Sequence, residues 1–152
     1  MAAEPDEIVK HLNPLIETCK DGEQGYRTAA KVVFTCELKQ LLESFANQRA
    51  LFATELQTEV QRLGGTSQKI GSITGTLHRG WLNLVSLVTG MDERAIFAVC
   101  ENGDGTAVRA YEEALKADLP PETRAIIERQ FRHIKEAYER VHALERVAAK
   151  GC

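Results

Sequence analysis

Apolar residues recur at intervals of three and four along most of the chain, which is the spacing of one face of an α-helix. The first run extends from Ile8 to Val33 and the second from Leu38 to Leu63. A third run covers Arg94 to Lys116, and a fourth follows Pro120-Pro121 and ends near Lys150. The pattern predicts four long amphipathic helices and no sheet.

Proline and glycine mark the expected ends of these helices. Pro14 lies inside the first run, so that helix is expected either to kink there or to begin afresh with Asn13 as its cap. A turn near Thr35 separates the first two helices, and Gly64-Gly65 predicts the end of the second. The segment 119–122 breaks the chain and opens the fourth helix, because proline is tolerated in a first turn.

A long connection, residues 65–91, joins the second and third helices. It becomes apolar at Leu77, Trp81, Leu84 and Val88, which predicts a fifth, shorter helix within it. A connection of this length can run along the whole bundle, so the second and third helices are expected to be parallel. This is the crossover topology of an all-α, ferritin-like four-helix bundle.

Composition limits the class of protein. A chain of 152 residues with 43% apolar and 27% charged residues predicts one globular domain, residues 1–152, rather than a disordered chain. The net charge is −3 and Lys and Arg are scattered among acids, which argues against a nucleic-acid partner. No apolar stretch is long enough to span a membrane and no signal region precedes the first helix, so we expect a cytoplasmic protein.

The four cysteines form no close pair of the kind used by zinc or redox motifs. Reduced thiols are therefore expected. Cys19 and Cys100 are interpreted as small core residues, with a redox pair as the alternative. His11 and His142 have no companion at a ligand spacing and are interpreted as surface residues.

Two segments carry the same short pattern. Residues 19–23 and 100–104 each place a cysteine, a glycine and an acid at the same offsets, and residues 42–48 align with 127–133. If the two hairpins are copies of one unit, Glu23 and Asp104 face each other across the middle of the bundle. Buried carboxylates need partners. The candidates at that level are Gln48, Gln130, His133 and Arg49, of which Arg49 is the strongest.

Three stretches, residues 15–23, 48–56 and 77–81, resemble a bacterial ferritin-like family of unknown function. This family is distantly similar to the stress-associated bundles of the YciE and YciF type. The resemblance extends over nearly the whole chain and includes Cys100-Glu101 and residues 128–130. It implies a fold more than an activity, because a fold does not fix a function.

Ferritin-like di-iron sites use one carboxylate from each of two helices and a Glu-x-x-His pair from each of the other two. Glu23 and Asp104 match the single carboxylates, but Phe45 and Gln48 stand where the first pair is needed. The full site is therefore absent.

The fourth helix offers only Gln130 and His133, with Gln in place of Glu. An incomplete site for iron or manganese would consist of Glu23, Asp104, Gln130 and His133. Glu55 and Glu59 lie one or two turns away, and an acidic pair on a solvated face explains them better.

The segment His78-Arg79-Gly80-Trp81 places polar groups beside the only tryptophan. His78, Arg79 and Trp81 would line a ligand pocket or a partner surface. The alternative, which we favour, is a crossover helix that Trp81 docks onto the bundle, with Arg79 reaching outward.

Two functions remain. The first, which the missing Glu-x-x-His pairs favour, is a non-enzymatic structural, stress-associated or interaction protein with a degraded metal site and no cofactor. The second is a metal-binding protein or oxidase that uses iron or manganese at the incomplete site. Catalytic triads, phosphate loops and zinc signatures are absent from the sequence. The flanks of the long helices predict a homodimer.

Overall fold

The computed structural model describes residues 4–65 and 93–149, without the side chains of 146–149. These parts of the chain contain four helices: α1 (Pro5–Val32), α2 (Cys36–Arg62), α4 (Glu93–Leu115) and α5 (Pro121–Ala149). All four follow the apolar periodicity, so the predicted helices are confirmed. The predicted crossover helix, with His78, Arg79 and Trp81, lies outside the described residues.

Helix α1 runs without interruption through Pro14, so it does not begin afresh there. Pro14 lies on the exposed side, while Leu12 and Leu15 beside it are fully buried. Proline removes one backbone hydrogen bond from a helix. Packing of the flanking leucines compensates, because most helix stability in proteins comes from the buried face. Pro121 opens α5 as expected, and Pro5 opens α1.

The turns after α1 and α2 fall where the sequence predicts them. Thr35 has an extended backbone (φ −81°, ψ 130°) and directly precedes α2. Gly64 has φ 84°, the left-handed conformation that glycine adopts without strain. Its N–H donates to the Gln61 carbonyl, and the Gly65 N–H donates to the Val60 carbonyl, each at 2.9 Å. These bonds satisfy carbonyls at the end of α2.

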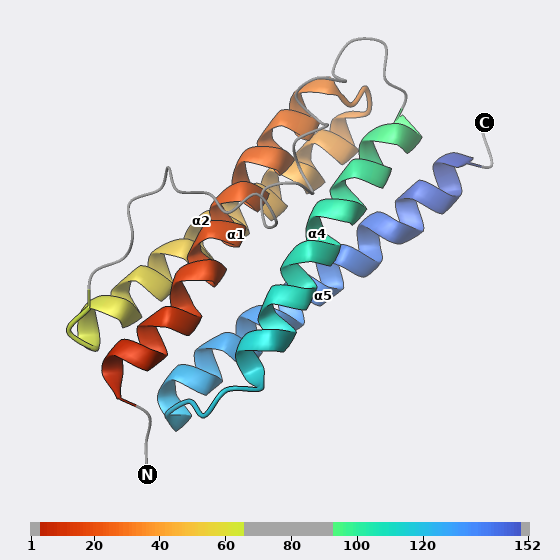
Figure 1. The fold of residues 1–152 in the computed structure, drawn as a ribbon. Coiled ribbons are helices and arrows are strands. Elements are labelled where there is room, and N and C mark those ends of the chain that lie inside the picture. The colour runs from red at the N-terminus through yellow and green to blue at the C-terminus, as the bar shows by residue number, and fades with distance from the viewer. Residues whose placement is uncertain (1–3, 66–92, 150–152) are drawn as a thin grey trace.

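The helices form two hairpins that lie side by side (Figure 1). Helix α1 packs along α2 and α4 along α5, while α1 and α4 form the main contact between the hairpins. Cys19 contacts Tyr111, and Tyr26 contacts Asp104. Moving forward along α1 from Cys19 to Tyr26 therefore corresponds to moving backward by the same number of residues along α4. Helices α1 and α4 are therefore antiparallel, which makes α2 and α4 parallel as the crossover topology requires. The fold is an all-α four-helix bundle.

The described residues form two apolar core clusters, one towards each end of the bundle. One cluster contains Leu12, Leu56 and Ile127, and the other contains Leu42, Phe97 and Val141. These side chains are fully or almost fully buried. The buried polar residues Arg49 and Asp104 lie in the middle of their helices, whereas Glu59 and Thr123 lie at the end of α2 and the start of α5. None of the described helices is long and apolar enough to cross a membrane.

Glu59 links the end of α2 to the start of α5. Its carboxylate accepts hydrogen bonds from Arg62 at 2.6 and 2.8 Å and from the Thr123 hydroxyl at 2.6 Å. The bonds to Arg62 and Thr123 lower the pKa of Glu59 below its ordinary value of 4.5, although burial opposes the shift. Glu59 is thus a buried carboxylate with partners, not part of a solvated acidic face.

We expect the Glu59→Gln variant to lose about 1 kcal/mol of stability at pH 7, because a charge-assisted network is broken. A depressed pKa in the folded protein stabilises it at pH values above 4.5, and this contribution disappears as the pH falls through the folded-state pKa. The difference in Tm between wild type and variant should therefore shrink below pH 4.5. Thermal unfolding followed by circular dichroism from pH 7 to pH 3 measures it.

Glu122→Gln is the matched control, because Glu122 also lies near Arg62, at 3.5 Å, but its side chain is 78% exposed. An exposed ion pair contributes little, so this variant should match wild type within about 0.5 kcal/mol. Equal losses in both variants would show that Thr123 and burial do not matter at Glu59.

Candidate functional site

An ion pair occupies the middle of the bundle. Arg49 of α2 donates from Nη1 to Asp104 Oδ1 at 2.6 Å and from Nη2 to Asp104 Oδ2 at 3.1 Å. The Tyr26 hydroxyl of α1 donates to the same Asp104 carboxylate. Arg49, Asp104 and Tyr26 are each completely buried. Side chains from three helices thus meet at one carboxylate. We call this site the Arg49–Asp104 centre.

The surroundings of Arg49 are shaped to hold it. Its guanidinium lies 5.4 Å from the centre of the Tyr26 ring, within the range of a cation–π contact. Gly22 of α1 leaves the space that the arginine fills, because a side chain there would begin 3.1 Å from Nη1. Burial is the largest single influence and lowers the pKa of Arg49, but the charge and hydrogen bonds of Asp104, together with Tyr26 and Cys19, outweigh it, so the pKa of Arg49 is raised. Burial, aided by the Asp104 charge, raises the pKa of Tyr26, which stays a neutral donor.

A second hydrogen-bonded chain crosses the bundle next to the ion pair. Tyr111 donates to Gln130 Oε1 at 2.7 Å and lies 3.1 Å from the Cys19 sulfur. Gln130 Nε2 donates to Glu55 Oε1 at 2.7 Å, and Arg129 pairs with the same carboxylate. This chain leads from the buried cysteine to the half-exposed Glu55, and it satisfies the polar groups of Gln130.

The buried cysteines behave as core residues. Cys19 and Cys100 are free and completely buried, and burial raises the pKa of Cys19 to about 11. Burial also raises the pKa of Cys100. A thiol with a high pKa is a poor nucleophile and a poor redox group. The geometry therefore favours the core interpretation over the redox pair.

Asp104 and Arg49 lie where the sequence predicts them, but Glu23 does not join them. The Glu23 carboxylate accepts hydrogen bonds from Arg27, the nearer at 2.9 Å, and its side chain is 31% exposed. On α1 it is Tyr26 that reaches Asp104. The predicted pair of facing acids is replaced by an acid facing a tyrosine and an arginine.

The register of the two hairpins explains the difference. The contacts Cys19–Tyr111 and Tyr26–Asp104 fix the register of α1 against α4. The sequence repeat aligns Cys19 with Cys100 and would place Glu23 opposite Asp104. The packing of α1 on α4 is therefore shifted by about one helical turn from the packing that the repeat predicts.

The other predicted bundle-centre residues divide between core and surface. Gln130 is completely buried and bonded as described above, and Gln48 is half-buried on α2. The His133 side chain is 46% exposed and lies 3.9 Å from Glu136 on its own helix. Glu23, Asp104, Gln130 and His133 thus do not converge on one point.

The bundle centre does not fit a di-metal site. Both oxygens of Asp104 are engaged by a guanidinium, which carries a permanent positive charge. The hydrogen-bonded groups described beside it are two tyrosines, a thiol, an amide and the Glu55 carboxylate, which Arg129 and Gln130 already engage, whereas a di-iron site needs several carboxylates and imidazoles. A cation placed there would meet the charge of Arg49 instead of ligands.

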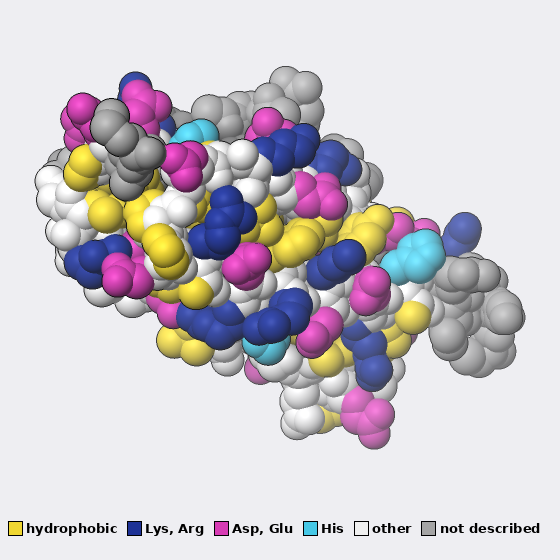
Figure 2. All heavy atoms as spheres, turned by 90° about the horizontal axis from the view of Figure 1, so that it is seen from below, with side chains coloured by type: hydrophobic (Ala, Val, Ile, Leu, Met, Phe, Trp, Pro, Cys, Tyr) yellow, Lys and Arg dark blue, Asp and Glu magenta, His cyan; other side chains and the backbone are white. Residues whose placement is uncertain are grey.

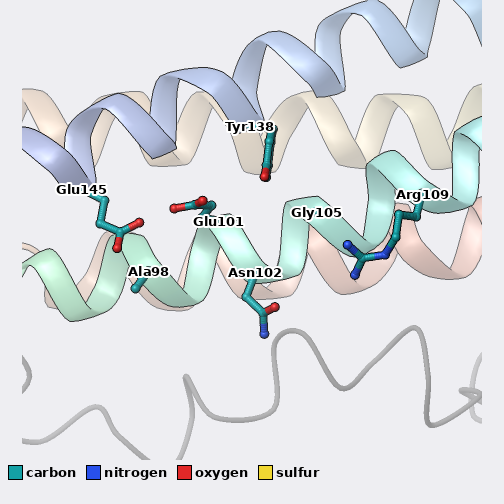
Figure 3. A pocket seen from close by; sticks show the side chains of 7 residues that line it. All are labelled: Ala98, Glu101, Asn102, Gly105, Arg109, Tyr138 and Glu145. Atoms are coloured by element: carbon teal, nitrogen blue, oxygen red, sulfur yellow. The ribbon is translucent and has the colours of Figure 1, made fainter.

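The described residues do contain one group of three metal-ligating side chains, on the outside of the α4–α5 hairpin. Glu101 of α4 and His142 and Glu145 of α5 each offer a ligand atom, and these atoms lie within 4.8 Å of one another. Figure 3 shows the carboxyl groups of Glu101 and Glu145 turned towards each other in the groove between the helices. The groove has a volume of about 280 Å³ and also includes Tyr138 and Arg109.

The charges in this group influence one another. The hydrogen bond between the two carboxyl groups, together with burial, raises the pKa of Glu145. The same hydrogen bond and the contact with His142 lower the pKa of Glu101, while burial opposes that change. His142 Nδ1 lies 2.9 Å from Glu101 Oε1.

Sequence reasoning missed this group. It placed His142 correctly at the surface but found no companion at a ligand spacing, and this second statement is wrong. Glu145 follows at i+3, on the same face of α5. Glu101 approaches only because α4 packs against α5.

Comparison with known proteins identifies the family of the chain and a similar fold. Residues 7–117, from α1 to the end of α4, match the family described as Domain of unknown function (DUF2383). The chain belongs to this family. Helix α5 lies beyond the matched region. No curated protein matches the chain.

One similar solved structure is the DPS protein from Vibrio cholerae O1, described as a member of a broad superfamily of ferritin-like diiron-carboxylate proteins. The alignment has a TM-score of 0.74 and covers 93% of this chain and 90% of the DPS chain, at 15% sequence identity. At this identity the likeness concerns the fold alone. The predicted ferritin-like bundle is confirmed.

Proposed function

We propose that this DUF2383 protein is a non-enzymatic helical bundle with a structural, stress-associated or interaction role in the cytoplasm. In it, an ion pair replaces the metal at the bundle centre. The observation that carries this proposal is the complete burial of Arg49 against Asp104. The similar DPS structure belongs to a superfamily of diiron-carboxylate proteins, and such proteins build their site from inward carboxylates and histidines. Here one of these inward positions carries a guanidinium.

A buried charge pair is costly to assemble and becomes very costly when one partner is lost. Asp104 therefore cannot leave Arg49 to ligate a metal without leaving the guanidinium unpaired in the core. Both oxygens of Asp104 already have donors, from Arg49 and Tyr26, so this carboxylate is satisfied without a cation. These contacts support a role for the centre in stability rather than in catalysis.

The test is to measure metal content and iron oxidation for the full-length protein in parallel with its His142→Ala variant, which lacks a member of the exposed Glu101–His142–Glu145 group. Both proteins are incubated with Fe²⁺ or Mn²⁺ and desalted before metal analysis. We expect the variant to retain no pair of metal ions per chain and to oxidise Fe²⁺ no faster than buffer. Two retained ions per chain, or catalysed oxidation, would contradict the proposal and favour the metal-binding alternative.

The surface charges support a partner other than nucleic acid. On the face shown in Figure 2, Lys and Arg alternate with Asp and Glu, and hydrophobic side chains are visible between them. Nucleic-acid binding depends on clustered positive charge. We therefore propose a protein partner.

We also propose that this partner includes a second copy of the chain. Phe34 and Leu51 are large apolar side chains that are 80% and 70% exposed, which supports self-association. Light scattering over a range of concentrations tests for a dimer, and a monomer at the highest concentration would contradict it.

A further inference from the structure

The exposed group on the α4–α5 hairpin brings together three side chains from two helices, each of which offers a ligand atom for a metal ion. Glu101 and Glu145 bring two carboxyl groups from different helices to the same point, and His142 adds an imidazole. At neutral pH two carboxylates at this distance repel each other, unless a proton or a cation lies between them. A divalent cation removes this repulsion and is attracted by both groups.

The helices hold these donors in a suitable arrangement. His142 and Glu145 are one turn apart on α5, and the i,i+3 spacing presents both on one face. Glu101 lies opposite on α4, with an oxygen 2.9 Å from His142 Nδ1. Each side chain is partly exposed, so small rotations can bring the three ligand atoms to coordinating distances.

The groove leaves space for the rest of a coordination sphere. Its volume of about 280 Å³ exceeds that of several waters, and Asn102, Arg109 and Tyr138 line it beside the two glutamates. A protein site with three ligands and open positions is completed by water or by a small anion. Arg109 supplies a positive charge in the same groove that favours an anionic ligand.

We propose that Glu101, His142 and Glu145 bind one divalent transition-metal cation, such as Zn²⁺, Co²⁺, Mn²⁺ or Fe²⁺, in the groove between α4 and α5. The imidazole nitrogen favours this class over Mg²⁺ and Ca²⁺, which take oxygen ligands. The site lies on the outer side of one hairpin and is separate from the Arg49–Asp104 centre. It therefore goes beyond the role proposed above and does not depend on it.

The experiment titrates the metal-free, full-length protein with Zn²⁺ by calorimetry, with the cysteines kept reduced by a non-thiol reductant. Titration with Co²⁺, followed by visible absorption, reports the coordination directly. We expect one site per chain for both ions. In His142→Ala and Glu145→Gln, affinity at this site should fall by about tenfold or more, since even the loss of a supporting group around a metal costs 10–100-fold.

His133→Ala is the matched control. His133 and Glu136 have the same i,i+3 spacing on the same helix, at 3.9 Å, but belong to no group of three among the described residues. This variant should bind like wild type. Circular dichroism of the metal-free proteins verifies that each variant folds. The proposal is overturned if wild type binds no ion at a single site, if His142→Ala and Glu145→Gln bind as tightly as wild type, or if Mg²⁺ binds equally well.

Discussion

Replacing Asp104 with alanine is expected to lower the free energy of unfolding by about 3–5 kcal/mol, the cost of removing one partner from a buried ion pair. The change leaves Arg49 buried without its counter-charge, and a guanidinium does not lose its proton to escape the penalty. It also removes the acceptor of the Tyr26 hydroxyl. Urea denaturation of the wild type and the variant, followed by circular dichroism, measures the difference.

The double variant Arg49→Met/Asp104→Ala separates the ion pair from a simple loss of packing. Methionine retains apolar volume near Gly22 and carries no charge, so the double variant should be more stable than Asp104→Ala alone. If Asp104→Ala stays within about 1 kcal/mol of wild type, or if the double variant is the less stable of the two, the ion pair does not have the role given to it here.

The helices follow from local features of the sequence, which explains why they were predictable. Each has an apolar face at helical spacing, and Gly64 and Pro121 mark boundaries through their own backbone preferences. The behaviour of Pro14 was less predictable, because the result depends on tertiary packing. The sequence shows the proline but not how much the burial of Leu12 and Leu15 compensates for it.

The centre of the bundle was predictable in its chemistry but not in its register. Asp104 lies on an otherwise apolar face and Arg49 occurs at the same level of α2, so a buried pair could be inferred. The alignment of residues 19–23 with 100–104 rests on composition, and a shift of one turn preserves an apolar stripe almost equally well. Packing of α1 on α4 decides the register, and it brings Tyr26 to Asp104 in place of Glu23.

The exposed group of Glu101, His142 and Glu145 was not predicted from the sequence, for a different reason. His142 and Glu145 have the spacing of ordinary charged pairs on helix surfaces, which are common. Only the third member distinguishes them, and Glu101 is distant in sequence. Contacts of this kind depend on which faces of two helices meet, and hydrophobic periodicity fixes the buried faces better than it fixes the edges.

Gly22 tests how tightly Arg49 is held. An alanine in a helix is normally more stable than glycine by about 1 kcal/mol. At Gly22 the new Cβ would lie 3.1 Å from Arg49 Nη1, an atom fixed by its 2.6 Å bond to Asp104. The guanidinium must move to make room, and overpacking of a buried site typically costs 1–3 kcal/mol. After the helix-propensity gain of Ala is subtracted, we therefore expect Gly22→Ala to be destabilising by up to about 2 kcal/mol in urea denaturation.

Gly105→Ala is the matched control, since Gly105 is also a buried glycine inside a helix. Its new Cβ would meet Tyr138 at 3.5 Å and Arg109 at 3.6 Å, which are ordinary contacts, so this variant should gain about 0.5–1 kcal/mol. In the Arg49→Met/Asp104→Ala background the guanidinium is gone, and Gly22→Ala should become neutral or stabilising. A loss at Gly22 that persists in this background would arise from the helix itself, and Arg49 would not be its cause.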